Sequence, residues 1–283
     1  MKIPTELEGK VDNLLNWCKG KCCILAFSGG VDSTLLGRIL VEAYDLSLLE
    51  IPLTGFYANS PTSTSNDILE VRRVADEIRL PLIVLESGEF NEPLFVENSS
   101  ERCYWCKRWR FGEIKRKALQ MCEPHYRSQI VLVDGSNSDD SFDYRPGTKA
   151  AKEIGVYSPL AEFGFSKKEI RALASSLELS VANKPSTPCL ATRLAYNLTL
   201  NEDRLRRVES AEQIIQEYTG GKGRARMDAP DSIRIELPEE YIESFATPEI
   251  RSCIVSKLRE LGFNFISLDL EGFLSGKYNR MLK

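Results

Sequence analysis

The first segment that could do chemistry is a glycine-containing stretch near the start of the chain. It reads Ser28, Gly29, Gly30, Val31, Asp32, Ser33 and Thr34. Glycines let backbone N–H groups approach an anion closely, a helix that begins here points its positive end at the same place, and three hydroxyl groups add donors. The stretch lacks the lysine of the Walker A pattern. It predicts a phosphate-binding loop, and the alternative is a glycine turn with a serine N-cap.

A second signal is a pair of cysteines, Cys103 and Cys106, with Cys189 far along the chain. Two thiols three residues apart can converge on one metal centre, and a third from a proline-restrained segment could complete a three-thiolate corner with one open coordination position. A closed zinc site needs a fourth ligand, and the single histidine, His125, has no obvious companion. The alternative is that these cysteines only pack. Packing is also the simplest interpretation of Cys18, Cys22, Cys23, Cys122 and Cys253.

Carboxylates and amides are concentrated between Asp134 and Gly147, directly after an apolar run. At the carboxyl edge of a sheet, such oxygens would suit a hydrated magnesium ion or a nucleotide. An acidic surface loop explains the same composition equally well.

Alternating strands and helices are expected to position these groups. An apolar run at 22–27 predicts a strand, and 31–44 carries apolar residues at helical spacing. Further strands are predicted at 51–58, 81–85 and 129–133, with helices at 66–78 and 105–121. This order predicts an α/β fold with a doubly wound parallel sheet, whose ligands lie at the carboxyl ends of the strands.

The pattern changes after residue 188. A charged helix at 201–218, a glycine-rich break at 220–223, a strand at 232–237, a helix at 248–261 and a strand at 263–268 predict a smaller α+β domain. The Lys184–Pro188 segment favours extended backbone. We therefore expect two domains, 1–187 and 188–283.

Composition limits the possible protein classes. A chain of 283 residues with 42% hydrophobic residues can bury a core, which excludes a disordered or fibrous protein. A net charge of −4 argues against a surface that binds nucleic acid over its whole extent, although basic residues between 204 and 226 form a local patch. No apolar run approaches the roughly 18 residues of a membrane helix. The start also lacks a signal-peptide stretch, so we expect a cytoplasmic protein.

Several blocks together resemble the LarE family of ATP-dependent sulfur transferases, within the PP-loop superfamily. The matching blocks are residues 26–33, 58–61, 103–107, 134–147, 158–160 and 183–193. The resemblance implies an enzyme that adenylates a substrate carboxylate, releases pyrophosphate and replaces AMP with sulfur. In this family such chemistry makes the pyridinium thiocarboxylate mononucleotide of the nickel pincer cofactor.

The resemblance also implies roles for particular residues. Catalytic roles fall to Cys189, Asp32 and Arg193. ATP and magnesium would be held by Ser28, Gly29, Gly30, Asp32, Ser33, Thr34, Asn59, Asp134 and Arg145. A 4Fe-4S cluster would be bound by Cys103, Cys106 and Cys189, with its fourth iron accepting an additional sulfide for delivery. Members with only the Cys189 position instead sacrifice that cysteine's own sulfur.

On the substrate side, the implied residues are Trp105, Thr192, Arg193, Glu212, Arg224 and Arg226. The Arg-x-Arg pair would grip a nucleotide phosphate by charge-assisted hydrogen bonds, and Trp105 would stack on a pyridinium ring. The alternative for each is a solvated helix face, a basic loop or a packed aromatic. The chain departs from the family pattern at Leu274, where an arginine is expected, and at Ala195 and Asn197, where proline and glycine are more usual.

Two other functions remain open. A tRNA-thiolating PP-loop enzyme would use the same ATP chemistry, and the local basic patch is its support. A non-catalytic nucleotide or cluster sensor would keep the fold without turnover. The expected partner is a small nucleotide-like carboxylate, in a homo-oligomer without membrane contact.

Overall fold

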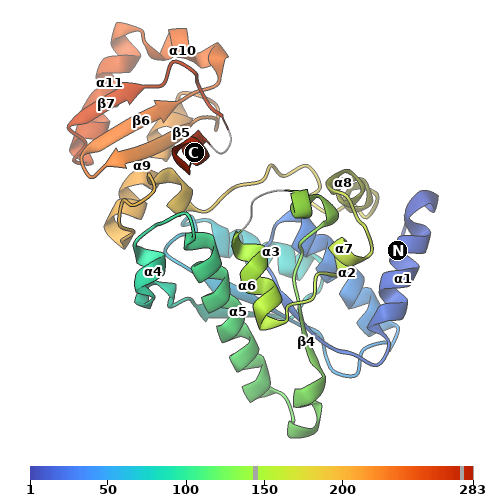
Figure 1. The fold of residues 1–283 in the computed structure, drawn as a ribbon. Helices are drawn as coiled ribbons and strands as arrows, with labels where there is room; N and C mark the ends of the chain where they lie inside the picture. Colours follow the sequence, from blue (N-terminus) through green and yellow to red (C-terminus); the bar gives the residue numbers. More distant parts are fainter. Residues whose placement is uncertain (143–145, 275–276, 283) are drawn as a thin grey trace. The chain divides into compact units, whose positions relative to one another are not determined.

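A computed structural model describes residues 1–142, 146–274 and 277–282 of the chain (Figure 1). It divides into two compact units. Unit 1 comprises Met1–Ser60, Ser65–Glu89 and Cys103–Thr187, and unit 2 comprises Pro61–Thr64, Phe90–Arg102 and Pro188–Lys283. Among the described residues, no helix is both long enough and apolar enough to cross a membrane.

Unit 1 is built on a parallel sheet with strand order β3-β2-β1-β4. Its strands are β1 (Cys22–Ala26), β2 (Thr54–Asn59), β3 (Leu82–Glu86) and β4 (Ile130–Val133). Its described α-helices are α1 (Thr5–Cys18), α2 (Val31–Asp45), α3 (Asp67–Glu77), α5 (Arg102–Met121), α6 (Pro146–Ile154), α7 (Pro159–Glu162) and α8 (Lys167–Ser176). The predicted doubly wound α/β fold is confirmed.

The two faces of this sheet are covered by different helices. Cys23 and Leu25 of β1 pack with apolar residues of α1, α2, α3 and α8, whereas Ile24 between them packs with α5 and α6 on the other face. Successive side chains of a strand point to opposite faces, so a strand covered on both sides must be apolar throughout. This explains why the run at 22–27, which contains β1, is apolar throughout.

The predicted element bounds need two corrections in unit 1. Helix α5 begins at Arg102, three residues before the predicted start, so Cys103 lies inside the helix. Strand β2 begins at Thr54, three residues after the predicted start, and residues 51–53 are irregular backbone.

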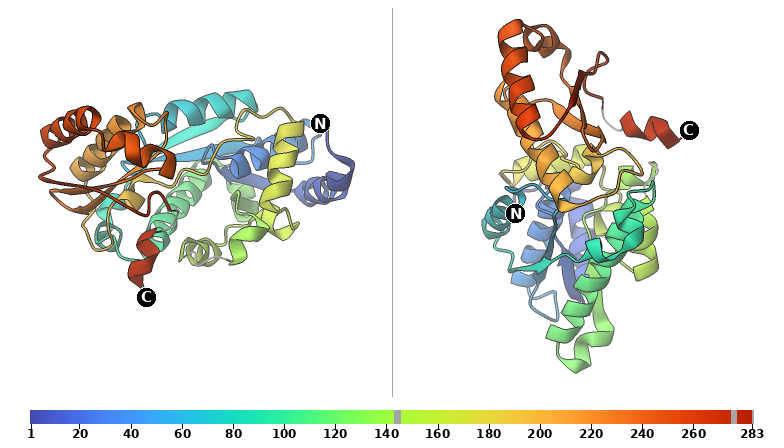
Figure 2. Two further views of the ribbon diagram at one scale, coloured as in Figure 1. Left: turned by 90° about the horizontal axis from the view of Figure 1, so that it is seen from above. Right: turned by 90° about the vertical axis from the view of Figure 1, so that its left-hand side faces the viewer.

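Unit 2 is a three-stranded sheet of order β5-β6-β7, in which β5 runs antiparallel to β6 and β7 parallel to it (Figures 1 and 2). Its strands are β5 (Arg224–Ala229), β6 (Ser232–Glu236) and β7 (Phe265–Leu268). Its helices are α4 (Pro93–Val96), α9 (Glu202–Glu217), α10 (Glu239–Phe245) and α11 (Pro248–Glu260). The predicted α+β pattern is present, with β5 as an additional strand.

Two short stretches from earlier in the chain are bound tightly into unit 2. Asn98 is fully buried and donates hydrogen bonds to the carbonyls of Ala195, at 2.8 Å, and Leu198, at 3.0 Å. Arg206 of α9 donates to the carbonyls of Pro61 and Ser63. The core of this unit is therefore completed by residues far apart in the sequence.

Candidate functional site

The loop between β1 and α2 is held in shape by its own hydroxyl groups. The Ser28 and Ser33 hydroxyl oxygens lie 2.9 Å apart, and the Ser33 hydroxyl donates to the Gly30 carbonyl at 3.1 Å. Gly29 adopts a positive φ of 69°, and a Cβ built there would lie 2.8 Å from a methyl carbon of Val71. The loop thus needs glycine for its backbone and for the close approach of α3.

One hydroxyl of this segment is buried without a partner. Thr34 is fully buried in the first turn of α2, and its Oγ1 finds no hydrogen-bond partner within the described residues. A buried polar atom left unpaired costs free energy unless something satisfies it. This orphan atom sits in the segment predicted to bind ATP, and it fits that prediction.

Asp32 at the start of α2 is paired with a lysine that the sequence analysis missed. The Lys167 Nζ lies 2.6 Å and 2.8 Å from the two carboxylate oxygens, and the Asn137 amide donates to the same group at 3.2 Å. Lys167 is the first residue of α8, which Ser166 and Glu169 begin with a capping box. That Ser-x-x-Glu pattern could have marked a helix start with a lysine at its anion-attracting end.

Asp134 follows β4 and lies beside the same loop. Its carboxylate accepts hydrogen bonds from the Ser136 hydroxyl at 2.8 Å and the Ser158 hydroxyl at 2.7 Å. A Cβ built on Gly135 would lie 2.7 Å from the Ser33 backbone nitrogen, so these two loops touch. The structure therefore brings Asp134 together with the Ser28–Thr34 segment.

The remaining predicted nucleotide ligands are placed differently. Asn59, at the end of β2, donates to the Glu86 carboxylate at the end of β3. Both residues lie at the carboxyl edge of the sheet, as expected for a ligand-binding edge. Arg145 lies outside the described residues.

The cysteine pair lies on the first turns of α5. Cys103 is exposed and Cys106 is half-buried. Lys107, the next residue, brings its Nζ to 4.0 Å from the Asp134 carboxylate. Gly147 makes room for this lysine, because a Cβ there would lie 2.6 Å from the Lys107 Cδ.

Trp105 packs within its own helix. Its ring meets Tyr104 edge-on with centroids 4.9 Å apart, and the Arg108 guanidinium lies 5.6 Å from its ring centroid. The predicted pyridinium contact would have to use ring surface that these neighbours leave open.

The third predicted metal ligand belongs to the other unit. Cys189 is exposed and directly precedes the 3-10 turn Leu190–Arg193 in unit 2. Within 1–142, 146–274 and 277–282, no three His, Cys, Asp or Glu side chains form a group suited to a metal ion. The assembly of the three cysteines into one site stays a prediction.

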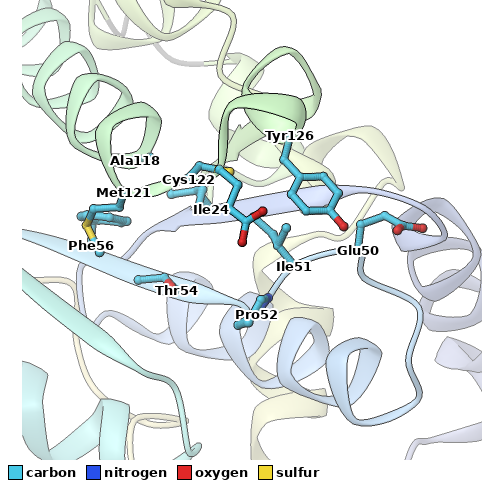
Figure 3. Close-up of a pocket in the computed structure, with 11 residues that line it drawn as sticks. Ile24, Glu50, Ile51, Pro52, Thr54, Phe56, Ala118, Met121, Cys122 and Tyr126 are labelled. Atoms are coloured by element: carbon cyan, nitrogen blue, oxygen red, sulfur yellow. The ribbon is translucent and has the colours of Figure 1, made fainter.

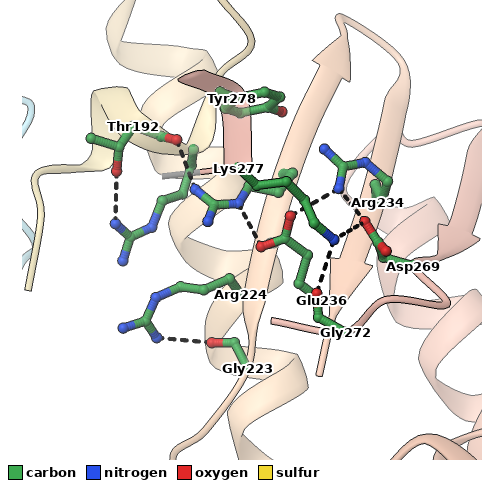
Figure 4. A network of polar contacts seen from close by, with 12 residues as sticks. Thr192, Gly223, Arg224, Arg234, Glu236, Asp269, Gly272, Lys277 and Tyr278 are labelled. Carbon is green, nitrogen blue, oxygen red and sulfur yellow. Dashed lines mark hydrogen bonds and ion pairs between the residues drawn. The ribbon is translucent and has the colours of Figure 1, made fainter. Parts of the chain in front are cut away.

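Arg193 and Arg226 are engaged in buried ion pairs of unit 2. Figure 4 shows the polar network around Glu236, the partner of Arg226. Arg193 is 1% exposed and makes two hydrogen bonds to Glu212, at 2.8 Å and 3.0 Å. Arg226 donates to Glu236 at 2.9 Å and to the Thr192 carbonyl at 2.8 Å. These guanidinium groups fix the segment that follows Cys189 against β5 and α9.

Arg224 differs from its two neighbours. It shares a face of β5 with Arg226, but its closest acidic group is Glu212 at 3.7 Å, and its guanidinium lies 5.3 Å from the Phe273 ring centroid. Burial lowers the pKa of Arg224, and the nearby charges of Arg193 and Arg226 lower it further, while Glu212 opposes them. This crowding of positive charge makes Arg224 the member of the set best suited to an anion.

A cavity of about 320 Å³ lies elsewhere in unit 1 (Figure 3). Ile24, Thr54, Phe56 and Ala118 are among its lining residues, which places it at the amino ends of β1 and β2 beneath the last turns of α5. None of the predicted site residues lines it.

The other cysteines follow the packing prediction only in part. Cys18, Cys22 and Cys23 are buried, and burial raises the pKa of the Cys18 thiol to about 12. The prediction is wrong for Cys253, which is exposed and has its sulfur 3.1 Å from the Tyr218 hydroxyl. Helix α11 presents that position to solvent because only Ile254 and Leu258 of the helix are buried.

Known proteins resemble this chain over nearly its whole length. No protein-family model matches it. An uncharacterised protein of Synechocystis is 34% identical over 98% of this chain and 99% of its own. The pyridinium-3,5-bisthiocarboxylic acid mononucleotide synthase of Lactiplantibacillus plantarum is 32% identical over 91% of this chain and 89% of its own.

A more distant relative shares only part of the chain. The tRNA-specific 2-thiouridylase MnmA of Streptomyces griseus is 29% identical over 58% of this chain and 51% of its own. The parallel sheet, the glycine loop at the end of β1 and the near full-length match to the pyridinium synthase agree with one another. The chain belongs to the LarE family of PP-loop sulfur transferases.

Proposed function

We propose that this protein transfers sulfur, at the expense of ATP, to a carboxylate of a pyridinium mononucleotide. The observation that carries the proposal is the placement of α5 in unit 1. Lys107, next to Cys106, brings its Nζ to 4.0 Å from the carboxylate of Asp134, which lies beside the Ser28–Thr34 loop. This approach connects the helix that carries the thiol pair to the edge of the sheet where the candidate ATP loop lies, and it supports a sulfur transfer coupled to ATP.

The first half of the proposed reaction is adenylation. A carboxylate oxygen of the acceptor attacks the α-phosphorus of ATP, and the bond from that phosphorus to the bridging oxygen breaks. Pyrophosphate leaves with the electron pair. Backbone N–H groups of the Ser28–Thr34 loop and the Lys167 ammonium would stabilise its charge.

In the second half, sulfur replaces AMP. A sulfide-level nucleophile forms a bond to the acyl carbon, and the bond between that carbon and the AMP oxygen breaks. The products are a thiocarboxylate and AMP. No electrons are gained or lost when the incoming sulfur is already at the sulfide level.

The proposal includes two inorganic groups. A magnesium ion would use carboxylate oxygens of Asp32 and Asp134, and it would neutralise phosphate charge. A 4Fe-4S cluster would be held by Cys103, Cys106 and Cys189, none of which is buried, and it would supply sulfide. Cys103, which is exposed, and Cys106, which is half-buried, lie one turn apart on α5, and this spacing supports such a group.

The acceptor phosphate is assigned to Arg224. Arg193 and Arg226 each donate to a carboxylate at 2.8–3.0 Å and to a backbone carbonyl, so we assign them a supporting role. Arg224 donates to the Gly223 carbonyl at 2.8 Å, but it comes only to 3.7 Å from Glu212. Thr192, whose hydroxyl accepts from Arg193 and donates to the Cys189 carbonyl, links this support to the cysteine loop.

Anaerobically purified protein tests the proposal directly. It would be incubated with ATP, magnesium, sulfide and pyridinium-3,5-dicarboxylic acid mononucleotide. We expect AMP and pyrophosphate in amounts that depend on the acceptor, and an acceptor whose mass shows oxygen replaced by sulfur. Asp32→Asn is the inactive control. Pyrophosphate release without sulfur in the acceptor would refute the proposal.

An iron and sulfide assay of the same preparation separates the two sulfur sources. About four irons per chain would support the cluster. A colourless protein that loses the Cys189 sulfur during turnover would instead support sacrifice of that cysteine.

A second candidate, tRNA thiolation, is favoured by the match to the tRNA-specific 2-thiouridylase over 58% of this chain. Filter binding with bulk tRNA at several salt concentrations tests it. Tight and steeply salt-dependent binding, together with thiolated uridine, would support tRNA as the acceptor.

A further inference from the structure

A fully buried carboxylate, Glu89, stands outside the residues used so far. It follows β3 and is 0% exposed. It accepts hydrogen bonds from the Ser60 hydroxyl at 2.5 Å, from the Ser87 hydroxyl, and from Arg110 Nη2 at 2.8 Å. Carboxylates are rarely buried unless they are paired, so this group has a specific structural role.

The three partners of Glu89 come from three different elements of unit 1. Ser60 directly follows β2, Ser87 directly follows β3, and Arg110 lies on α5. Arg110 comes four residues after Cys106, so it lies one helical turn further along the same side of the helix. A single carboxylate therefore ties the carboxyl ends of two strands to the helix that carries the thiol pair.

This tie lies on one flank of the thiol pair, and separate contacts to α6 and β4 lie on the other. Towards α6, the Tyr104 hydroxyl donates to Glu153 at 2.6 Å. Towards β4, Lys107 comes no closer than 4.0 Å to Asp134. The Arg110 and Glu89 pair is the close, charged contact that fixes α5 to the ends of β2 and β3.

Burial makes the tie sensitive to loss of either partner. Glu89 is completely shielded from water, and the Arg110 side chain is 25% exposed. If one charge is removed, the other is left poorly compensated in a low-dielectric setting. Removal of either Glu89 or Arg110 is therefore expected to disrupt the whole hydrogen-bond network and not only one of its contacts.

We propose that Glu89 and Arg110 are positioning residues, which hold the Cys103 and Cys106 turn in register with the ATP loop while sulfur is transferred. This inference rests on the proposed function. It implies that adenylation, which uses the Ser28–Thr34 loop, survives loss of the tie, whereas sulfur delivery from the α5 side does not.

Two variants and a matched control test the proposal in the full-length protein. Glu89→Gln keeps the shape of the side chain and removes its charge. Arg110→Lys keeps the positive charge and removes the planar guanidinium group with its paired donors. Glu113→Gln, on the same helix, removes the carboxylate of an exposed pair with Arg116. Hydrogen exchange of residues 102–110 and the rates of pyrophosphate and thiocarboxylate formation would be measured for all three.

In Glu89→Gln we expect exchange in 102–110 to become about tenfold faster or more, because a local contact that opposes opening is lost. Thiocarboxylate formation should slow by about tenfold, with pyrophosphate release within about twofold of the unaltered protein. For Arg110→Lys, the rates of hydrogen exchange and of thiocarboxylate formation should lie between those of Glu89→Gln and those of the unaltered protein. Glu113→Gln should change neither rate. Unchanged exchange in both variants would overturn the proposal.

Equal losses of pyrophosphate and thiocarboxylate formation would also overturn it, since they would indicate general damage and not a misplaced thiol pair. If the unaltered protein forms no pyrophosphate with the pyridinium acceptor, the proposed function fails. The hydrogen exchange of residues 102–110 would still decide whether the tie exists.

Discussion

The ion pair between Arg193 and Glu212 yields a prediction about stability as well as activity. Both side chains are almost fully buried, and Glu212 also accepts a hydrogen bond from the Ala225 backbone at 3.2 Å. Glu212→Gln keeps the size and one carbonyl oxygen but removes the charge that faces Arg193. The change leaves a buried guanidinium without its counter-ion.

The expected loss of folding stability follows from the burial of this pair. Removal of one partner of a buried ion pair destabilises a protein by about 3–5 kcal/mol, and the oxygen kept by glutamine places this variant near 3 kcal/mol. For a unit of this size, that loss lowers the midpoint of thermal unfolding by about 10 °C or more. We expect activity to fall with it, because Thr192 and the cysteine loop lose their anchor.

The assay must report on unit 2 alone. All three tryptophans, Trp17, Trp105 and Trp109, lie in unit 1, so tryptophan fluorescence follows that unit only. Hydrogen exchange of α9 and β5 in increasing urea follows unit 2. Glu240→Gln is the matched control, because its pair with Lys222 is exposed and such pairs contribute little.

The two variants must differ clearly in the urea concentration at which unit 2 unfolds. Glu212→Gln should expose α9 and β5 at much lower urea, while fluorescence from unit 1 stays near that of the unaltered protein. If Glu212→Gln proves no less stable than Glu240→Gln, the pair is not a structural anchor. Glu212 would then be available to act on a ligand.

Three further predictions concern unit 1. Gly135→Ala should cost about 1–3 kcal/mol and weaken ATP binding in equilibrium dialysis, since the added carbon meets loop backbone, whereas Gly112→Ala has open space and should bind ATP normally. Lys167→Met should slow pyrophosphate release on the order of 100-fold, and an unchanged rate would contradict its role. Burial alone would raise the pKa of Glu169, but hydrogen bonds from Lys10 and the helix N-terminus hold it at about 2, below the ordinary 4.5. Its contribution is therefore complete above pH 4.5 and lost as pH falls towards 2, so the urea midpoints of the unaltered protein and Glu169→Gln should converge over that range.

Local patterns were sufficient to predict the strand, loop and helix around the candidate ATP site. The apolar run before Ser28 and the helical spacing after Gly30 are signals that neighbouring residues carry by themselves. Strand β5 has a local signal that the predicted elements leave out. Ala225 and Met227 are buried and alternate with Arg224 and Arg226, which is a strand pattern. The phosphate contact predicted for the two arginines stays a prediction.

Contacts between distant residues could not be predicted in this way. Lys167 and Asp32 are separated by 135 positions, and only the fold brings α8 to the start of α2. Likewise, Arg193 was predicted to meet the substrate, and nothing in its neighbourhood indicated that Glu212 would enclose it. Charge and residue type predict that an arginine binds an anion, but the fold decides which one.

Unit 2 is assembled from three separate stretches of chain, and this constrains how the protein can be made and exchanged. During synthesis, Asn98 emerges from the ribosome well before Ala195 and Leu198, so its amide must stay hydrated until the last third of the chain arrives. A recombination event that moved residues 188–283 alone would leave those carbonyls unpaired. The two units are therefore expected to be inherited together, and grafts between homologues should carry 61–64 and 90–102 with the C-terminal part.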